Sequence, residues 1–242
     1  MDDLDISQLA AYLHLNPDKV VKMATRGKLP GRRVGGQWRF SKAEIHHWLE
    51  RQIGASDADD LERYERVVGS PESGDDPEPH APSAGQITIA ELLPATRIAV
   101  SMRARTRGSV IRTMCELATT GGMMWDAPAM ATAVESREQM HPTALDCGVA
   151  LLHPRRPQTS ILAESVLALG VCPGPIPFTG DGQLVDVFWL ICSYDDREHL
   201  PILARISRLL TTTDLLTQLR QSETANEAHH AVVRCEQSLK ER

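Results

Sequence analysis

Hydrophobic positions near the start of the chain repeat with the spacing of short amphipathic helices. Within residues 6–13, four apolar side chains fall on one face of a first predicted helix. Asn16 followed by Pro17 suits the N-cap and first position of a second helix, which we expect to run to about Thr25. Gly27 then ends it. The pattern predicts two short helices with a tight connection, which is a helix-turn-helix arrangement.

The segment after Gly27 changes from helical to alternating spacing. Leu29 to Phe40 reads as two short strands around the Gly35–Gly36 turn, which is a wing. Ser41 is a suitable cap for a third helix, whose buried side is predicted to consist of Ile45, Trp48 and Leu49. Trp38 and Trp48 are predicted to be core residues rather than base-stacking groups.

The second half of the chain alternates apolar runs with helical stripes. We predict strands at 98–102, 149–152, 165–172 and 187–192, with Pro173–Pro175 breaking the third before it resumes at 176–178. Helices are predicted from about 107 to 118, from Asp126 to about Arg137, from about His199, and from about Asp214 and Thr224. This order predicts an α/β domain with a mixed sheet flanked by helices.

A segment of distinct composition lies between the predicted helix-turn-helix region and the predicted α/β domain. Residues 55–85 form an acidic stretch rich in Pro, Ser and Gly, which lacks the apolar area to fold and is predicted to be a flexible linker. Leu61, Tyr64 and Val68 at its start have helical spacing and could pair with a second copy, so a homodimer is one expected partner. The predicted domains are therefore 1–54, 55–85 and 86–236.

Charge and hydrophobicity narrow the class of protein. Of 242 residues, 42% are hydrophobic, which is enough for a buried core, and no apolar run approaches the roughly 18 residues of a membrane span. The N-terminus is acidic rather than signal-like, so we expect a cytoplasmic protein without membrane insertion. Its five cysteines lack Cys-x-x-Cys spacing and predict reduced thiols; no metal or other cofactor is expected.

The chain has a net charge of −6, but one of its segments is strongly basic. Eight Lys and Arg residues, with no Asp or Glu among them, lie between Lys19 and Lys42. The order of helix, wing and third helix over residues 4–49 resembles the excisionase branch of winged helix-turn-helix domains, related to the MerR type. The resemblance implies contact with double-stranded DNA by the second helix and the wing. The predicted contacts are Lys19, Lys22, Arg26, Arg32, Arg33 and Arg39. A helix-turn-helix used for protein contacts is the alternative.

A histidine at the end of an apolar run is the main candidate for chemistry. Val149 to Leu152 reads as a buried strand, and Pro154 after His153 stops the strand because it has no N–H to donate. Arg155 and Arg156 follow, and their guanidinium groups suit a phosphate. His153 therefore faces a rim and could accept a phosphoryl group, although a histidine before a proline is often a polar loop residue.

The surrounding segments make the chemical interpretation more specific. An Arg137–Glu138 pair precedes the stretch Gly148 to Arg155, and Glu198–His199–Leu200 follows it before a helix. This order resembles the enzyme IIA domain of the mannitol/fructose and nitrogen-regulatory class of the bacterial phosphotransferase system, from about Ile87 to Val233. The sequence departs from the family pattern at Pro142–Thr143, Asp146–Cys147 and Leu152.

The resemblance assigns roles to three residues. His153 would accept phosphate from a histidine-containing phosphocarrier protein, His199 would help to hold the phosphoryl group, and Arg137 would orient it. Arg155 and Arg156 are secondary phosphate-binding candidates. These roles imply a DNA-binding regulator that responds to the phosphotransferase system through His153. The alternatives are a component that passes phosphate to a sugar permease subunit, and a non-phosphorylated interaction domain.

Overall fold

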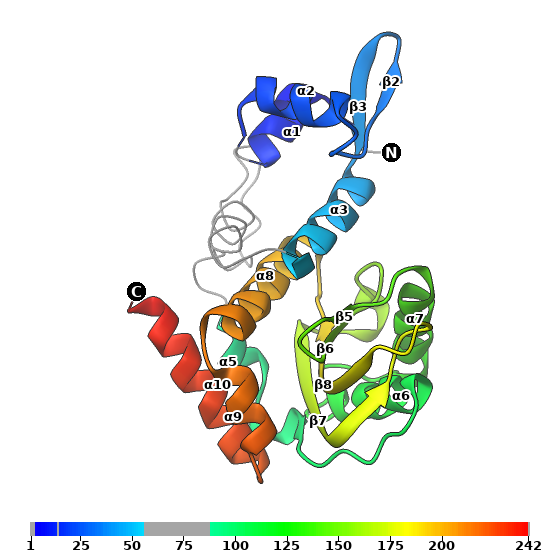
Figure 1. The fold of residues 1–242 in the computed structure, drawn as a ribbon. Coiled ribbons are helices and arrows are strands. Elements are labelled where there is room, and N and C mark those ends of the chain that lie inside the picture. Colours follow the sequence, from blue (N-terminus) through cyan, green and yellow to red (C-terminus); the bar gives the residue numbers. More distant parts are fainter. Residues whose placement is uncertain (1–2, 14, 56–87, 242) are drawn as a thin grey trace. The chain divides into compact units, whose positions relative to one another are not determined.

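A computed structural model describes residues 3–13, 15–55 and 88–241. The chain divides into two compact units, residues 1–87 and 88–242 (Figure 1). The predicted linker and the helix predicted at its start fall on residues 56–87 and lie outside the described residues. No helix in the described ranges is long and apolar enough to cross a membrane.

Two capped helices begin the first unit, as predicted. Helix α1 (Ile6–Tyr12) starts at Asp5, whose side chain accepts from the backbone N–H of Gln8 in a capping box. Helix α2 (Pro17–Thr25) starts at Asn16, whose side chain accepts from the backbone N–H of Asp18. Gly27 follows with a φ of +67°, a value that glycine adopts without strain.

The predicted wing is present, with one strand more than expected. Strand β2 (Arg32–Val34) pairs antiparallel with β3 (Gln37–Ser41), and Gly35 and Gly36 between them have φ values of +59° and +81°. Two positive φ angles suit a two-residue hairpin turn, which is why glycine occupies both positions. The short β1 (Asp3–Leu4) pairs with the other edge of β3. A strand this short gives too little alternation to be predicted.

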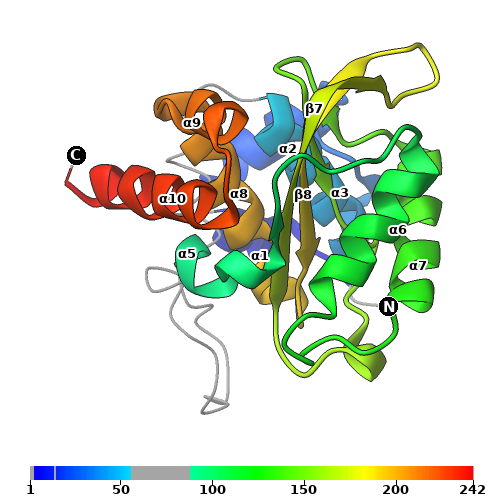
Figure 2. The same cartoon turned by 90° about the horizontal axis from the view of Figure 1, so that it is seen from below.

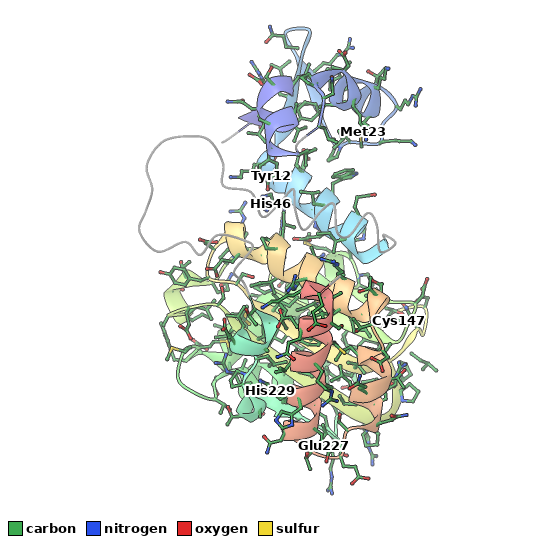
Figure 3. All side chains as sticks on the ribbon, turned by 90° about the vertical axis from the view of Figure 1, so that its left-hand side faces the viewer. Tyr12, Met23, His46, Cys147, Glu227 and His229 are labelled. Atoms are coloured by element: carbon green, nitrogen blue, oxygen red, sulfur yellow. The ribbon has the colours of Figure 1, made fainter. Side chains whose placement is uncertain are left out.

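Helix α3 (Lys42–Ala55) closes the core of the first unit. Its predicted inward residues Ile45, Trp48 and Leu49 are all buried. On its outer flank His46 stacks on Tyr12 of α1 with ring centroids 5.8 Å apart, and Figure 3 labels both residues. A polar contact between the Tyr12 hydroxyl and the His46 ring adds to this packing, so α1 and α3 are held together by more than apolar burial.

A five-stranded mixed sheet forms the centre of the second unit, in the order β4-β7-β8-β6-β5. Its strands are β4 (Ile98–Ala99), β5 (Ala144–Leu145), β6 (Val149–Leu152), β7 (Val166–Pro177) and β8 (Leu184–Cys192). Strands β6 and β8 run parallel, as do β4 and β7, whereas β7–β8 and β5–β6 are antiparallel. The fold class predicted from the sequence is therefore confirmed.

Helices cover both faces of this sheet (Figure 2). On one face lie α6 (Arg107–Ala118) and α7 (Ala127–Met140). On the other lie α5 (Ile89–Leu92), α8 (Asp196–Thr212), α9 (Leu215–Gln221) and α10 (Ala225–Lys240). Two 3-10 turns, Ala95–Arg97 and Thr159–Ile161, complete the unit. On α6 the side chains of Val110, Met114 and Cys115 are fully buried.

Three strand predictions were wrong in extent. The strand expected at 187–192 begins three residues earlier, at Leu184. The strand expected at 98–102 stops at Ala99, because the chain turns at Ser101, a non-glycine residue with a φ of +59°. The break expected at Pro173–Pro175 does not end β7, which continues to Pro177 through an irregular register between Val171 and Ile176. A bulge accommodates prolines that a regular ladder could not pair.

The packing of β7 against α6 gives a stability prediction. A Cβ at Gly170 would lie 2.6 Å from Met114 Sδ and 3.0 Å from Met102 Cε. We expect Gly170→Val to lower the free energy of unfolding by about 1–3 kcal/mol through overpacking, measured by urea denaturation. Gly174→Val is the matched control, since a Cβ at Gly174 meets nothing within 4 Å. Equal losses in the two variants would contradict this account of the packing.

Candidate functional site

The carboxyl ends of two parallel strands place both predicted histidines at one edge of the sheet. Leu152, the last residue of β6, is paired with Leu190 of β8, so His153 leaves the sheet close to where β8 ends. Side chains alternate along a strand, and Ala150 and Leu152 point into the core beneath α6 and α7. His153 therefore points to the opposite face, where α8 carries His199 in its first turns.

The two imidazole rings are brought together. Their centroids lie 4.8 Å apart with an interplanar angle of 53°. Nδ1 of His153 lies 2.8 Å from the carbonyl oxygen of Leu151. A carbonyl oxygen can accept but not donate, so Nδ1 carries the proton of the neutral ring and Nε2 keeps its lone pair. His153 thus presents a nucleophilic nitrogen with a fixed orientation.

His199 is oriented by a hydroxyl group. Its Nδ1 lies 3.2 Å from Oγ of Ser193, the residue that follows β8. With the Ser193 hydroxyl donating to Nδ1, the neutral ring carries its proton on Nε2 and can donate from that atom. With this donor direction the two rings have opposite tautomers, an arrangement that suits attack on a phosphorus atom by His153 and donation to a phosphoryl oxygen by His199.

Both rings are enclosed in this conformation. His153 is 2% exposed and His199 is 9% exposed. Two neighbouring rings differ from a histidine packed in an apolar core, because Nδ1 of each ring has a polar contact.

A buried carboxyl group organises the turn before β5. Glu138 is 1% exposed and accepts from the backbone N–H of Thr143 at 3.2 Å and from the Thr143 hydroxyl. Burial raises the pKa of Glu138, against the hydrogen bonds of Thr143 and the charge of Arg137. Arg137 is also buried, in the last turn of α7, and its Nη1 donates to the His141 carbonyl oxygen at 2.7 Å. Its predicted role in orienting phosphate stays a prediction.

A second carboxyl group immediately precedes His199 in the sequence. Glu198 accepts a hydrogen bond from the Ser165 hydroxyl, and the same Oγ accepts from the backbone N–H of Tyr194 at 2.8 Å. Burial raises the pKa of Glu198, the Ser165 contact lowers it, and the nearby carboxylate of Asp195 raises it further. These contacts connect the start of β7 with the start of α8, beside the histidine pair.

Arg155 and Arg156 are placed on the surface. Both are exposed in the turn that follows Pro154. Exposed guanidinium groups next to a strand end can still meet an anion delivered from solvent. Their function as phosphate ligands stays a prediction.

In the first unit, α2 displays a basic face. Lys19, Lys22 and Arg26 are exposed, and their spacing of three and four residues places them on one side of the helix. Val20 and Ala24 are buried on the other side. This separation allows the helix to present cations while its apolar side packs against the unit.

The arginines of the wing differ in their surroundings. Arg32 pairs with Asp3 at 2.6 Å, and the Arg33 guanidinium lies over the Trp38 ring, 5.1 Å from its centroid. Arg39, directly opposite Arg32 in the hairpin, donates to a neighbouring glutamine side chain at 3.3 Å. An exposed ion pair such as Arg32–Asp3 is weak, so a phosphate can compete with the carboxylate for this arginine.

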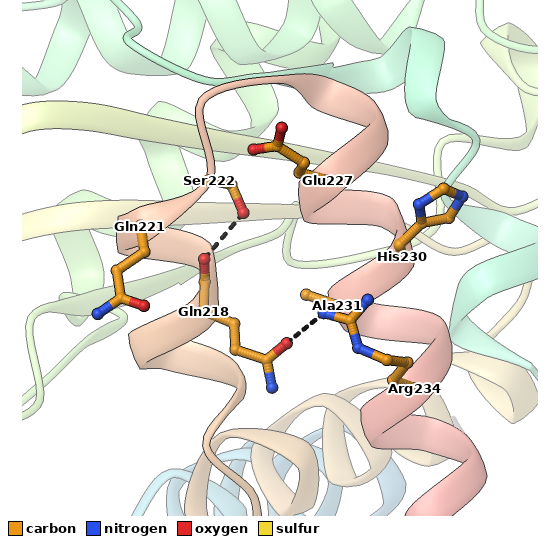
Figure 4. A pocket seen from close by; sticks show the side chains of 7 residues that line it. All are labelled: Gln218, Gln221, Ser222, Glu227, His230, Ala231 and Arg234. Atoms are coloured by element: carbon orange, nitrogen blue, oxygen red, sulfur yellow. Dashed lines mark hydrogen bonds between the residues drawn. The ribbon is translucent and has the colours of Figure 1, made fainter.

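A polar cleft lies elsewhere in the second unit, between α9 and α10 (Figure 4). Across it Arg234 Nη2 donates to the Gln218 side-chain oxygen at 2.6 Å. Its lining consists of Gln218, Gln221, Ser222, Glu227, His230, Ala231 and Arg234. The cleft contains none of the predicted site residues, so it does not contribute to the histidine site.

The groups that contact the histidine rings, and the buried carboxyl group near them, were not predicted from the sequence. Ser193 has one usable signal, as the first polar residue after the clearest buried strand. Glu138 belongs to the Arg–Glu pair and Thr143 to a departure from the family pattern, but neither signal indicates a role in orienting a histidine. The carbonyl oxygen of Leu151 is a backbone atom and leaves no sequence signal at all.

Comparison with known proteins identifies both units. Residues 91–234 match the family described as phosphoenolpyruvate-dependent sugar phosphotransferase system, EIIA 2, and residues 4–53 match a helix-turn-helix domain. The "Nitrogen regulatory protein" of Bradyrhizobium diazoefficiens is 37% identical over 93 residues. This alignment covers 37% of the present chain and 58% of the relative. The two resemblances predicted from the sequence are therefore confirmed at the level of these domains.

Solved structures show the fold of the second unit. The nitrogen regulatory protein IIA-Ntr of Neisseria meningitidis superposes with a TM-score of 0.53 at 19% identity, covering 60% of this chain and 98% of its own. The mannitol IIA protein of Escherichia coli superposes with a TM-score of 0.51 at 18% identity. The match covers 57% of this chain and 97% of the mannitol protein. Both relatives are covered over nearly their whole length.

Proposed function

The chain belongs to the EIIA 2 family of the phosphoenolpyruvate-dependent sugar phosphotransferase system, and from this membership we propose that it is a DNA-binding regulator whose second unit accepts a phosphoryl group on His153. The observation that carries the proposal is the histidine pair, with ring centroids 4.8 Å apart and Nδ1 of His153 committed to a carbonyl oxygen. This arrangement leaves Nε2 as the acceptor atom.

The proposed donor is the phosphohistidine of a carrier protein. The Nε2 lone pair of His153 attacks phosphorus, the phosphorus–nitrogen bond of the donor breaks, and its electron pair returns to the donor ring. The transition state spreads negative charge over the equatorial oxygens, so catalysis consists mainly of positioning and charge stabilisation. His199 Nε2–H is the proposed donor to one oxygen, and Arg137 supplies the orienting positive charge, with Arg155 and Arg156 as outer ligands.

Phosphorylation would change the charge at the end of the sheet. A phosphoryl group adds about two negative charges and strong acceptor oxygens next to His199. Such a change can order or release segments around the site, and so alter contacts with DNA or with a partner protein. We propose this change as the signal that the helix-turn-helix unit converts into DNA occupancy.

The basic face of α2 gives a test of DNA binding. We expect Lys22→Ala to weaken binding to duplex DNA and to lower the slope of log affinity against log salt by about 1, because one phosphate contact is lost. Titration of labelled duplex at several salt concentrations measures both quantities. The control is Lys240→Ala, at the exposed end of α10 in the other unit. An unchanged salt slope in Lys22→Ala would remove this residue from the interface.

A further inference from the structure

A continuous set of hydrogen bonds leads from the buried Glu138 to the ring of His153. Glu138 accepts from the N–H and hydroxyl of Thr143. The carbonyl oxygen of Thr143 accepts from the Leu151 N–H at 3.2 Å. The Leu151 carbonyl oxygen in turn accepts from Nδ1 of His153 at 2.8 Å. These bonds connect α7, the segment before β5 and the end of β6.

We propose that Glu138 and Thr143 are positioning residues that set the orientation and the tautomer of His153 through the Leu151 peptide. The inference rests on the proposed function, because it assigns a role in making Nε2 of His153 the acceptor atom. Neither side chain needs to touch the phosphoryl group. They act by fixing the carbonyl oxygen that holds Nδ1–H.

The burial of Glu138 supports this role. A carboxyl group that is 1% exposed is costly to place in the interior, and an apolar side chain of similar volume would often give equal or greater stability. What the carboxyl group provides and an apolar group cannot is directional contact with two donors of one residue. Thr143 supplies both donors, one from its backbone and one from its side chain.

The position of Thr143 supports the role independently. Thr143 directly precedes β5, which pairs antiparallel with β6. The Leu151 N–H bond to Thr143 extends this ladder by one step, to the residue whose carbonyl oxygen holds the imidazole. Anchoring Thr143 therefore anchors the last step of the ladder before His153. Groups that orient a metal-bound histidine through its second nitrogen affect affinity or activity by roughly ten- to a hundredfold, and we take this as the scale for His153.

The test removes one hydroxyl group and leaves the backbone unchanged. Full-length Thr143→Val is compared with the wild type and with Thr132→Val, a matched substitution at an exposed threonine of α7. Nitrogen-15 NMR of labelled histidine reports the tautomer of His153, and the initial rate of phosphorylation reports its reactivity. In Thr143→Val we expect a mixture of tautomers and a rate lower by about tenfold or more. In Thr132→Val both should match the wild type.

Thr143→Ser tests whether the hydroxyl group alone is sufficient. It restores the hydroxyl group without the methyl group, so it should recover the wild-type tautomer and rate. A wild-type tautomer in Thr143→Val, or a serine variant as impaired as the valine variant, would overturn the inference. If the wild type itself takes up no phosphate, the proposed function fails, whereas the tautomer comparison still decides the positioning role.

Discussion

Replacing His153 with alanine is expected to abolish phosphoryl uptake by the full-length protein. The variant lacks the nucleophilic nitrogen, and no other histidine of the described second unit combines a ring neighbour at 4.8 Å with a carbonyl-bound Nδ1. Incubation with phosphoenolpyruvate, enzyme I and the histidine-containing carrier, followed by intact-mass measurement, should show one acid-labile phosphoryl group on the wild type. His153→Ala should show none.

The control for this experiment is a histidine outside the site. His230 is exposed on α10, so His230→Ala should be phosphorylated like the wild type. If His153→Ala were phosphorylated to the wild-type extent, the acceptor would have to be a residue other than His153. A wild type that gains no mass would favour the alternative of an interaction domain that is not phosphorylated.

Replacing Glu236 with alanine is expected to destabilise the second unit by about 3–5 kcal/mol, because a buried ionic network loses its shared acceptor. Glu236 is 2% exposed on α10. It accepts from the backbone N–H groups of Ile89 and Ala90 at 2.9 and 3.1 Å, and from Arg205 Nε at 3.3 Å. The N-cap residue of α5 makes no side-chain capping bond, so Glu236 supplies acceptors for these N–H groups from a distant helix.

Urea denaturation measures this loss. Gln237→Ala, at an exposed position on the same helix, is the control and should change the free energy of unfolding by no more than about 0.5 kcal/mol. Glu236→Gln keeps one acceptor oxygen, so its loss of unfolding free energy should lie between those of Glu236→Ala and Gln237→Ala. A loss in Glu236→Ala no larger than that of the control would mean that α5 is held by apolar packing alone.

Local signals were sufficient to predict most elements of the fold. Asn16–Pro17, the Gly35–Gly36 turn and the apolar run of β8 each determine their structure within a few residues, and all three were confirmed. Helix α5 was not predicted, because its short span carries no helical period and is capped by Glu236, far along the chain. The continuation of β7 past its prolines likewise depends on β8, which pairs with Ile176 and Pro177 after the bulge.

The candidate site could be proposed from the sequence only as far as it rests on side-chain identity and order, and the roles of its residues stay predictions. The sequence placed His153 at a strand end and His199 near the start of a helix, but it could not give the 4.8 Å separation of their rings. The tautomer of His153 depends on a backbone carbonyl oxygen, and the support of that carbonyl depends on the Glu138–Thr143 contact. The bond that links the two, from the Leu151 N–H to the Thr143 carbonyl oxygen, arises from the pairing of β5 with β6 and has no local signature in the sequence.

Nε2 of His153 is the single atom on which the proposed phosphoryl transfer depends. NMR of the phosphorylated, nitrogen-15 histidine-labelled protein tests it directly through the one-bond coupling between phosphorus and nitrogen. We predict coupling to Nε2 of His153, with Nδ1 still protonated and bonded to the Leu151 carbonyl oxygen. Coupling to Nδ1 of His153, or to a nitrogen of any other histidine, would contradict the account.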